Sequence, residues 1–165
     1  MAVGSVSRLS QKVLQIRRFL PYFGFVESSK SPILIEARRE ELRRLGVQAL
    51  YLFGSRAMGY EHARSDYDYA VLLKEEGHKR GDALYDKLYD LLSPISPRTL
   101  ENDVLDIVFL RDAGLELRFH VIRHGRVLFE SDPSARMNFE ARTTLLYCDY
   151  RPVLDEFDRN LLESL

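Results

Sequence analysis

Four residues near the middle of the chain have the types and the spacing to bind a phosphate compound through a metal ion. Gly54 and Ser55 are followed, after ten residues, by Asp66 and Asp68. Side chains alternate between the two faces of a strand, so the two carboxylates would project from one face. Carboxylates this close repel each other unless a cation lies between them, and such hard oxygen ligands favour Mg²⁺ or Mn²⁺. The pair therefore predicts a divalent-metal site.

A third acid, Asp106, is the only polar residue of the apolar segment VLDIVFL at 104–110. A charge in such a strand is costly unless it is compensated, and a metal ion would compensate it. Three carboxylates on neighbouring strands are what two-metal nucleotidyl transfer requires. Gly54 would let the backbone approach a phosphate, and Ser55 would offer its amide and hydroxyl at a helix start. The alternative is that the first two acids form a solvated turn and the third faces water.

Hydrophobic patterns predict the elements that must position these residues. Apolar, β-prone runs predict strands at 47–53, 67–73 and 104–110, with a further short run at 126–130. Apolar residues at helical spacing predict helices around 84–91 and at 113–124, and a helical remainder at the C-terminal end. Strands that alternate with helices in this way predict an α/β (α+β) fold.

A further helix is expected before the first strand. Ser31 and Pro32 have the types that begin a helix, and Gly46 suits a left-handed stop. Three apolar residues between these positions are expected to face the core: Ile35, Leu42 and Leu45.

The C-terminal segment carries more apolar surface than a small sheet can cover. Its stripe at helical spacing consists of Phe139, Leu146, Val153, Phe157 and Leu161, and Pro152 predicts a break or kink. Part of the stripe is expected to face another chain. The alternative is that it packs wholly inside the domain.

Composition bounds the function without naming it. A chain of 165 residues suggests one domain, and a net charge of −1 gives no reason to expect direct binding to nucleic acid or to a membrane surface. Cys148 is the only cysteine, so an intrachain disulfide and a thiolate metal cage are both excluded. No apolar stretch approaches the roughly 20 residues that span a bilayer. A cytoplasmic location is expected.

The motif of Gly-Ser, ten residues, Asp-x-Asp and a later acid in an apolar strand resembles the nucleotidyltransferase superfamily typified by DNA polymerase β. The short chain looks like its minimal nucleotidyltransferase (MNT) branch, whose members are commonly antitoxins paired with a HEPN-domain toxin. The resemblance extends over roughly 32–110 and implies a small mixed sheet with flanking helices. It also implies a division of the chain into an N-terminal helical extension at 1–28 and a nucleotidyltransferase domain at 29–165.

The resemblance implies a role for each motif residue. Gly54 and Ser55 would contact the triphosphate of ATP, and Asp66 and Asp68 would bind two Mg²⁺ ions, with Mn²⁺ as a substitute. Asp106 would complete the catalytic metal site.

Three positions near the motif are less defined. Arg56 would either neutralise phosphate charge or be an exposed helical arginine. The chain departs from the commonest family pattern at Met58 and at Arg64, which leaves the acceptor open.

The function that the resemblance implies is transfer of AMP from ATP to a tyrosine hydroxyl of a HEPN-type toxin. One alternative is a small-molecule nucleotidyltransferase of the antibiotic-modifying kind, although such enzymes usually carry a larger second domain. Another is a non-catalytic MNT module that neutralises a toxin by binding it. Assembly into a homo-oligomer is compatible with either reading.

Two histidines suggest other chemistry only weakly. His120 and His124 lie four residues apart, as zinc ligands on a helix do, but the glutamate of a metalloprotease helix is absent between them. Arg118 and His124 have the spacing of a HEPN ribonuclease motif, yet the strand-rich first half argues against that all-helical fold.

Overall fold

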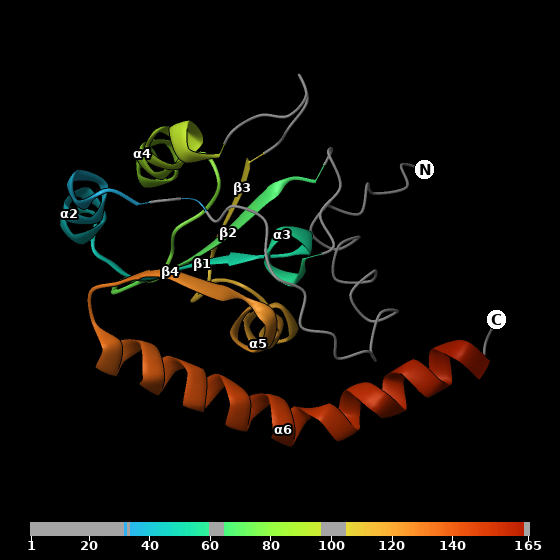
Figure 1. Cartoon of the computed structure of the whole chain (residues 1–165). Coiled ribbons are helices and arrows are strands. Elements are labelled where there is room, and N and C mark those ends of the chain that lie inside the picture. Colours follow the sequence, from blue (N-terminus) through green and yellow to red (C-terminus); the bar gives the residue numbers. More distant parts are fainter. Residues whose placement is uncertain (1–31, 33, 60–64, 97–104, 164–165) are drawn as a thin grey trace.

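A computed structural model describes residues 32, 34–59, 65–96 and 105–163 of the chain. A four-stranded sheet with the order β3-β2-β1-β4 lies between two layers of helices, as Figure 1 shows. The strands are β1 (Val47–Phe53), β2 (Tyr67–Leu73), β3 (Leu105–Phe109) and β4 (Arg126–Glu130). The helices are α2 (Glu36–Arg44), α3 (Ser55–Met58), α4 (Ala83–Leu92), α5 (Leu115–His124) and α6 (Pro133–Glu163), with a 3₁₀ turn at Ser93–Ile95. The predicted small mixed sheet with flanking helices is confirmed.

The sheet mixes both kinds of strand pairing. β1 pairs antiparallel with β2 and with β4, whereas β2 pairs parallel with β3. The predicted strands at 47–53 and 67–73 match β1 and β2 residue for residue, because both runs are apolar and buried on two faces. The third strand ends one residue earlier than predicted, at Phe109.

Alternate residues of the strands divide the core into two clusters. Leu50 and Leu52 of β1 pack with α2 and α4, whereas Tyr51 and Phe53 face the cluster that includes residues of α5. Because side chains alternate with period two, Asp68 shares the face of Ala70 and Leu72, and Asp106 shares the face of Val108. Both acids therefore lie on the α5 side of the sheet.

α2 begins later than the sequence predicts. Ile35 is the residue before the helix, with an extended backbone (ψ 158°), and its side chain is 53% exposed. Its expected place in the core is wrong, because the extended backbone leaves the neighbouring Leu34 to fill the core instead. Leu42 is fully buried and Leu45 packs against the same cluster, as expected. Gly46 has φ +77°, which confirms the left-handed stop.

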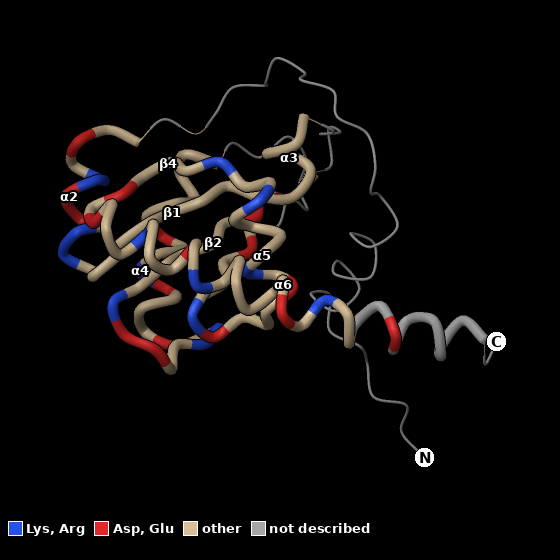
Figure 2. The backbone as a smooth tube through the Cα atoms, turned by 90° about the horizontal axis from the view of Figure 1, so that it is seen from below, with Lys and Arg blue, Asp and Glu red and all other residues tan. Residues whose placement is uncertain are grey.

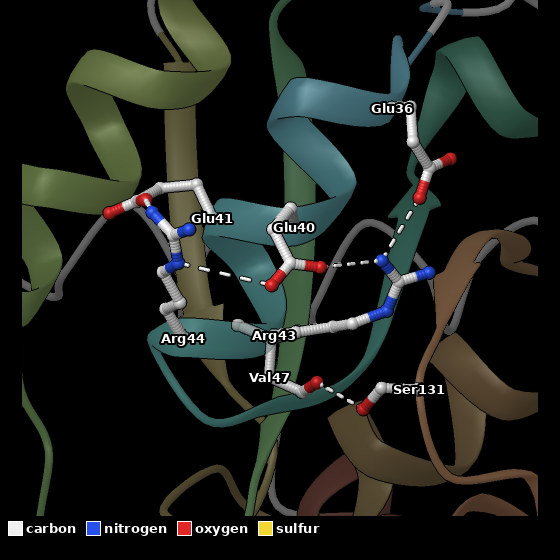
Figure 3. Close-up of polar contacts among 7 residues, drawn as sticks. All are labelled: Glu36, Glu40, Glu41, Arg43, Arg44, Val47 and Ser131. Carbon is white, nitrogen blue, oxygen red and sulfur yellow. Dashed lines mark hydrogen bonds and ion pairs between the residues drawn. The ribbon is translucent and has the colours of Figure 1, made fainter.

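Ion pairs cover the outer side of α2 (Figure 3). Nη1 of Arg43 lies 3.0 Å from Oε1 of Glu36 and 3.0 Å from Oε2 of Glu40. All three side chains are exposed. Exposed pairs of this kind contribute roughly 0–1 kcal/mol each, so burial rather than charge holds α2 on the sheet. Figure 2 shows basic and acidic positions side by side along this helix.

α6 runs without interruption through Pro152, so of the predicted break or kink the break is wrong and the kink stays a prediction. Proline removes one backbone donor, which leaves the carbonyl of the residue four positions earlier without its helical partner. Cys148 and Pro152 are both exposed, so water can satisfy that carbonyl. Figure 1 shows α6 as one long, gently curved helix along the α5 side of the molecule.

Other expectations lie partly or wholly outside this description. The proposed extension at 1–28 belongs to residues that the structure does not describe, as do Ser31 and Arg64. The side chains of Phe157 and Leu161, at the end of the predicted stripe, also lie outside it. Among the helices of the described ranges, none combines the length and the apolar character needed to cross a membrane.

Candidate active site

The turn after β1 brings the backbone directly against a carboxylate. Gly54 has φ +75°, a conformation that only glycine adopts readily, and it begins the short helix α3. A Cβ at this position would collide with Oδ2 of Asp68. Gly54 is therefore required both by backbone conformation and by the approach of Asp68.

Asp68 and Asp106 are neighbours across the parallel β2–β3 pair. They are register partners and lie 6% and 5% exposed. Neighbouring strands are about 4.8 Å apart, so the two carboxylates leave adjacent backbones on the same face. Asp66 precedes β2 and is only half-buried. In the described ranges no group of three or more potential ligands is arranged to hold a metal ion, so Asp66 is not gathered with the other two.

Arg80, which the sequence analysis missed, forms an ion pair with Asp106. Nη1 of Arg80 is 3.3 Å from Oδ1 of Asp106. The Arg80 side chain is 69% exposed, whereas that of Asp106 is 7% exposed. Arg80 lies in the loop between β2 and α4, and nothing in its local sequence distinguishes it from the neighbouring Lys79.

Two other carboxylates fix that loop. The backbone amides of Gly77 and His78 donate to Asp112, at 2.8 and 3.3 Å. Asp82 caps α4 by accepting from the amide of Tyr85 at 2.7 Å, and this bond lowers the pKa of Asp82. The loop is therefore anchored at both ends around Arg80.

Arg56 binds its own chain. Its Nε donates to the carbonyl of Ser65 at 2.8 Å, and its guanidinium carbon lies 3.9 Å from the centre of the Tyr67 ring. The side chain is half-buried, so the exposed helical arginine of the sequence analysis is not what the structure has. These contacts connect α3 to the start of β2 and so hold the two halves of the motif together.

The two histidines of α5 lie away from the motif acids in sequence but pack on the same side of the sheet. Their ring centres are 5.0 Å apart. Burial lowers the pKa of His120 to about 4, and the neighbouring His124 adds to the effect. The pair lacks a third ligand among the described residues.

The donor set at the sheet edge suits a hard divalent cation. Asp68 and Asp106 supply only carboxylate oxygens, which Mg²⁺ and Mn²⁺ prefer. Asp106 is nearly buried and already draws a guanidinium, which shows that this position calls for positive charge.

Comparison with known proteins assigns the chain to a family. Residues 39–134 match the family described as polymerase beta, nucleotidyltransferase. A protein adenylyltransferase MntA of Aphanizomenon flos-aquae (strain 2012/KM1/D3) is 34% identical over 126 residues, which cover 70% of this chain and 81% of that protein.

Solved structures agree with this match. A chain of a toxin–antitoxin crystal structure with AMP-PNP superposes with a TM-score of 0.53 at 26% identity and covers 75% of this chain and 98% of its own. A chain of a mutant MntA toxin–antitoxin complex superposes with the same TM-score at 25% identity. The glycine turn, the Asp68–Asp106 pair and these matches together identify the chain as a member of the polymerase β nucleotidyltransferase family.

Proposed function

We propose that this protein transfers AMP from ATP to a tyrosine hydroxyl of a HEPN-type toxin and thereby acts as its antitoxin. The observation that carries the proposal is the buried Asp68–Asp106 pair beside the turn at Gly54. The relative that is a protein adenylyltransferase, and the toxin–antitoxin structure with AMP-PNP, support the reaction class and the nucleotide.

The residues of the site have separate tasks in this reaction. Gly54 and Ser55 would receive the triphosphate at the turn. Asp66 and Asp68 would hold Mg²⁺, or Mn²⁺ in its place, and Asp106 would complete the site once Asp66, half-buried just before β2, turns toward the other two. When bound, the cations neutralise charge on the phosphates and favour the ionised acceptor.

The acceptor oxygen attacks the α-phosphorus of ATP, a new O–P bond forms, and the bond to the β-phosphate breaks so that pyrophosphate leaves. A tyrosine hydroxyl has a pKa of about 10, so ionising it at neutral pH costs about 4 kcal/mol. Asp106 is placed to accept the hydroxyl proton or to hold the acceptor in line. The strands β2 and β3 hold the acidic side chains in fixed positions, and this orientation further accelerates the reaction.

A surface on α6 supports a protein partner. Phe139 and Thr143 pack against the domain, and the same helix face continues as Leu146, Tyr150 and Val153. These three residues are 45%, 48% and 53% exposed. The stripe therefore runs beyond the part of the domain that covers it, as expected for a helix that binds another chain.

The test is transfer of label from ATP to a co-purified HEPN partner in the presence of Mg²⁺, with the modified residue located by mass spectrometry. Asp66→Asn and Asp68→Asn should each abolish transfer, because each removes a metal-binding charge at nearly constant volume. Asp90→Asn, on the exposed side of α4, is the matched control and should retain the wild-type rate.

Asp106→Asn separates binding from chemistry. This variant should bind MgATP nearly normally and fail at transfer. Most of the wild-type rate in either Asp66→Asn or Asp68→Asn, or label on a small molecule in place of the partner, would contradict the proposal.

A further inference from the structure

The loop between β2 and α4 places a cation on the carboxylate of Asp106. Nη1 of Arg80 lies 3.3 Å from Oδ1 of Asp106, within ion-pair distance. Gly54 approaches the carboxylate pair from β1, whereas Arg80 meets it at β3, the edge strand of the sheet. Arg80 therefore reaches the pair from the side opposite the proposed triphosphate turn.

This contact is built by the loop. Asp112 holds the amides of Gly77 and His78, and Asp82 accepts from the amide of Lys79 at 3.2 Å. Three residues around the arginine are thus tied to fixed carboxylates, while the Arg80 side chain itself is 69% exposed. The backbone of the loop is anchored, and the guanidinium can leave Asp106 for water without disturbing that backbone.

We propose that Arg80 is a positioning residue that competes with the divalent cation for the Asp106 carboxylate. The inference rests on the proposed function, in which Asp106 completes the metal site. A guanidinium and a metal ion bind the same lone pairs of a carboxylate. Two cations on one carboxylate also repel each other. Metal entry at Asp106 therefore requires Arg80 to turn outward, into the solvent that already surrounds most of its side chain.

Removal of Arg80 should tighten metal binding. In a Mn²⁺ titration followed by the paramagnetic resonance signal of free Mn²⁺, Arg80→Gln should bind Mn²⁺ roughly three- to tenfold more tightly than the wild type. Arg80→Lys keeps the charge and should lie between the two. Lys79→Gln removes the same charge from the neighbouring exposed residue and should change the affinity by less than about twofold.

A double-mutant cycle tests whether the effect passes through Asp106. When Asp106 is replaced by asparagine, adding Arg80→Gln should leave the remaining Mn²⁺ affinity unchanged within about twofold. Thermal unfolding of each variant checks that the fold is intact.

Three results would overturn the inference. Unchanged or weaker binding in Arg80→Gln would show that Arg80 does not compete, and so would an equal gain when Arg80→Gln is added to the Asp106→Asn variant. Weakened Mn²⁺ binding in Asp66→Asn would then show that the metal site itself stands. Mn²⁺ binding that ignores both Asp66→Asn and Asp106→Asn would overturn the metal site of the proposed function together with this inference.

Discussion

At the scale of single residues, the site depends on how closely backbone and carboxylate approach. Gly54 and Gly46 both have positive φ, at +75° and +77°, and the ψ of −156° at Gly54 puts it in a region that only glycine adopts readily. They differ in their surroundings. A Cβ at Gly54 meets the Asp68 carboxylate, whereas a Cβ at Gly46 meets nothing within 4 Å.

This difference yields a matched pair of variants. Gly46→Ala and Gly54→Ala should each lose at least about 1–2 kcal/mol of unfolding free energy through backbone strain, with the larger loss at Gly54. Only Gly54→Ala should also lose MgATP binding and transfer, because its methyl group displaces Asp68. Calorimetry with MgATP and chemical denaturation of both variants make the comparison. Equal MgATP affinity in the two folded variants would show that the approach of Gly54 to Asp68 has no part in the site.

Residue identity could be predicted for part of the site only. The spacing from Gly54 and Ser55 predicts Asp68, and Asp106 is conspicuous because it is an acid inside an apolar strand. Arg80 was missed because it contacts a residue 26 positions further along the chain, beyond α4. No local sequence pattern encodes such a contact. The sequence leaves Arg56 between two readings, since its partners Ser65 and Tyr67 lie beyond an intervening segment.

At the scale of elements, the long helix α6 divides into an anchored and a projecting part. Tyr51 of β1 donates to Glu140 at 2.8 Å, and Phe119 of α5 stacks on Tyr147 with ring centres 3.9 Å apart. From Cys148 to Val153 every side chain is exposed. The first half of α6 thus belongs to the domain, while the stripe beyond it is available to a partner.

Two adjacent leucines test this division. Leu146 lies on the stripe and is 45% exposed, whereas Leu145 is 68% exposed and lies about 100° away around the helix. Leu146→Glu should therefore reduce capture of the HEPN partner at least tenfold in a pull-down, and Leu145→Glu should leave it within about twofold. Both variants should bind MgATP as the wild type does, because neither residue lies near β1, β2 or β3. Equal capture by the two variants would assign the partner interface to another surface.

The ends of helices and strands could be predicted from the sequence where a single physical effect determines them. Apolar side chains fill most positions of the runs that form β1 and β2, so their burial sets both ends. Two competing causes produced the errors. Pro32 favours a helix start, but Ile35 has an extended backbone and α2 begins only at Glu36, while Leu34 is buried in the core. Pro152 disfavours a helix interior, but in an exposed stretch the lost bond costs too little to end α6.

At the scale of the whole molecule, one buried histidine links stability to pH. His120 is 9% exposed on α5, and its Nε2 atom has no hydrogen-bond partner among the described residues. Burial, with a smaller contribution from His124, lowers the pKa of His120 to about 4 from its ordinary 6.5. The native protein therefore keeps this ring neutral at pH values where the unfolded chain has already bound a proton.

The sign of the effect follows from that difference. Stability from His120 is complete above pH 6.5 and is lost as the pH falls from 6.5 toward 4, because the unfolded state binds more protons in this range. The loss is at most about 3 kcal/mol. Denaturant unfolding of the wild type at pH 7, 5.5 and 4.5 should show it, and His120→Gln should lose much less stability over the same range. His78→Gln, which removes a half-buried ring whose Nδ1 lies 3.3 Å from Oδ2 of Asp82, keeps His120 in place and should retain most of the wild-type loss. If His120→Gln and the wild type lost stability in parallel, protonation of carboxylates rather than of His120 would govern the acid unfolding of this protein.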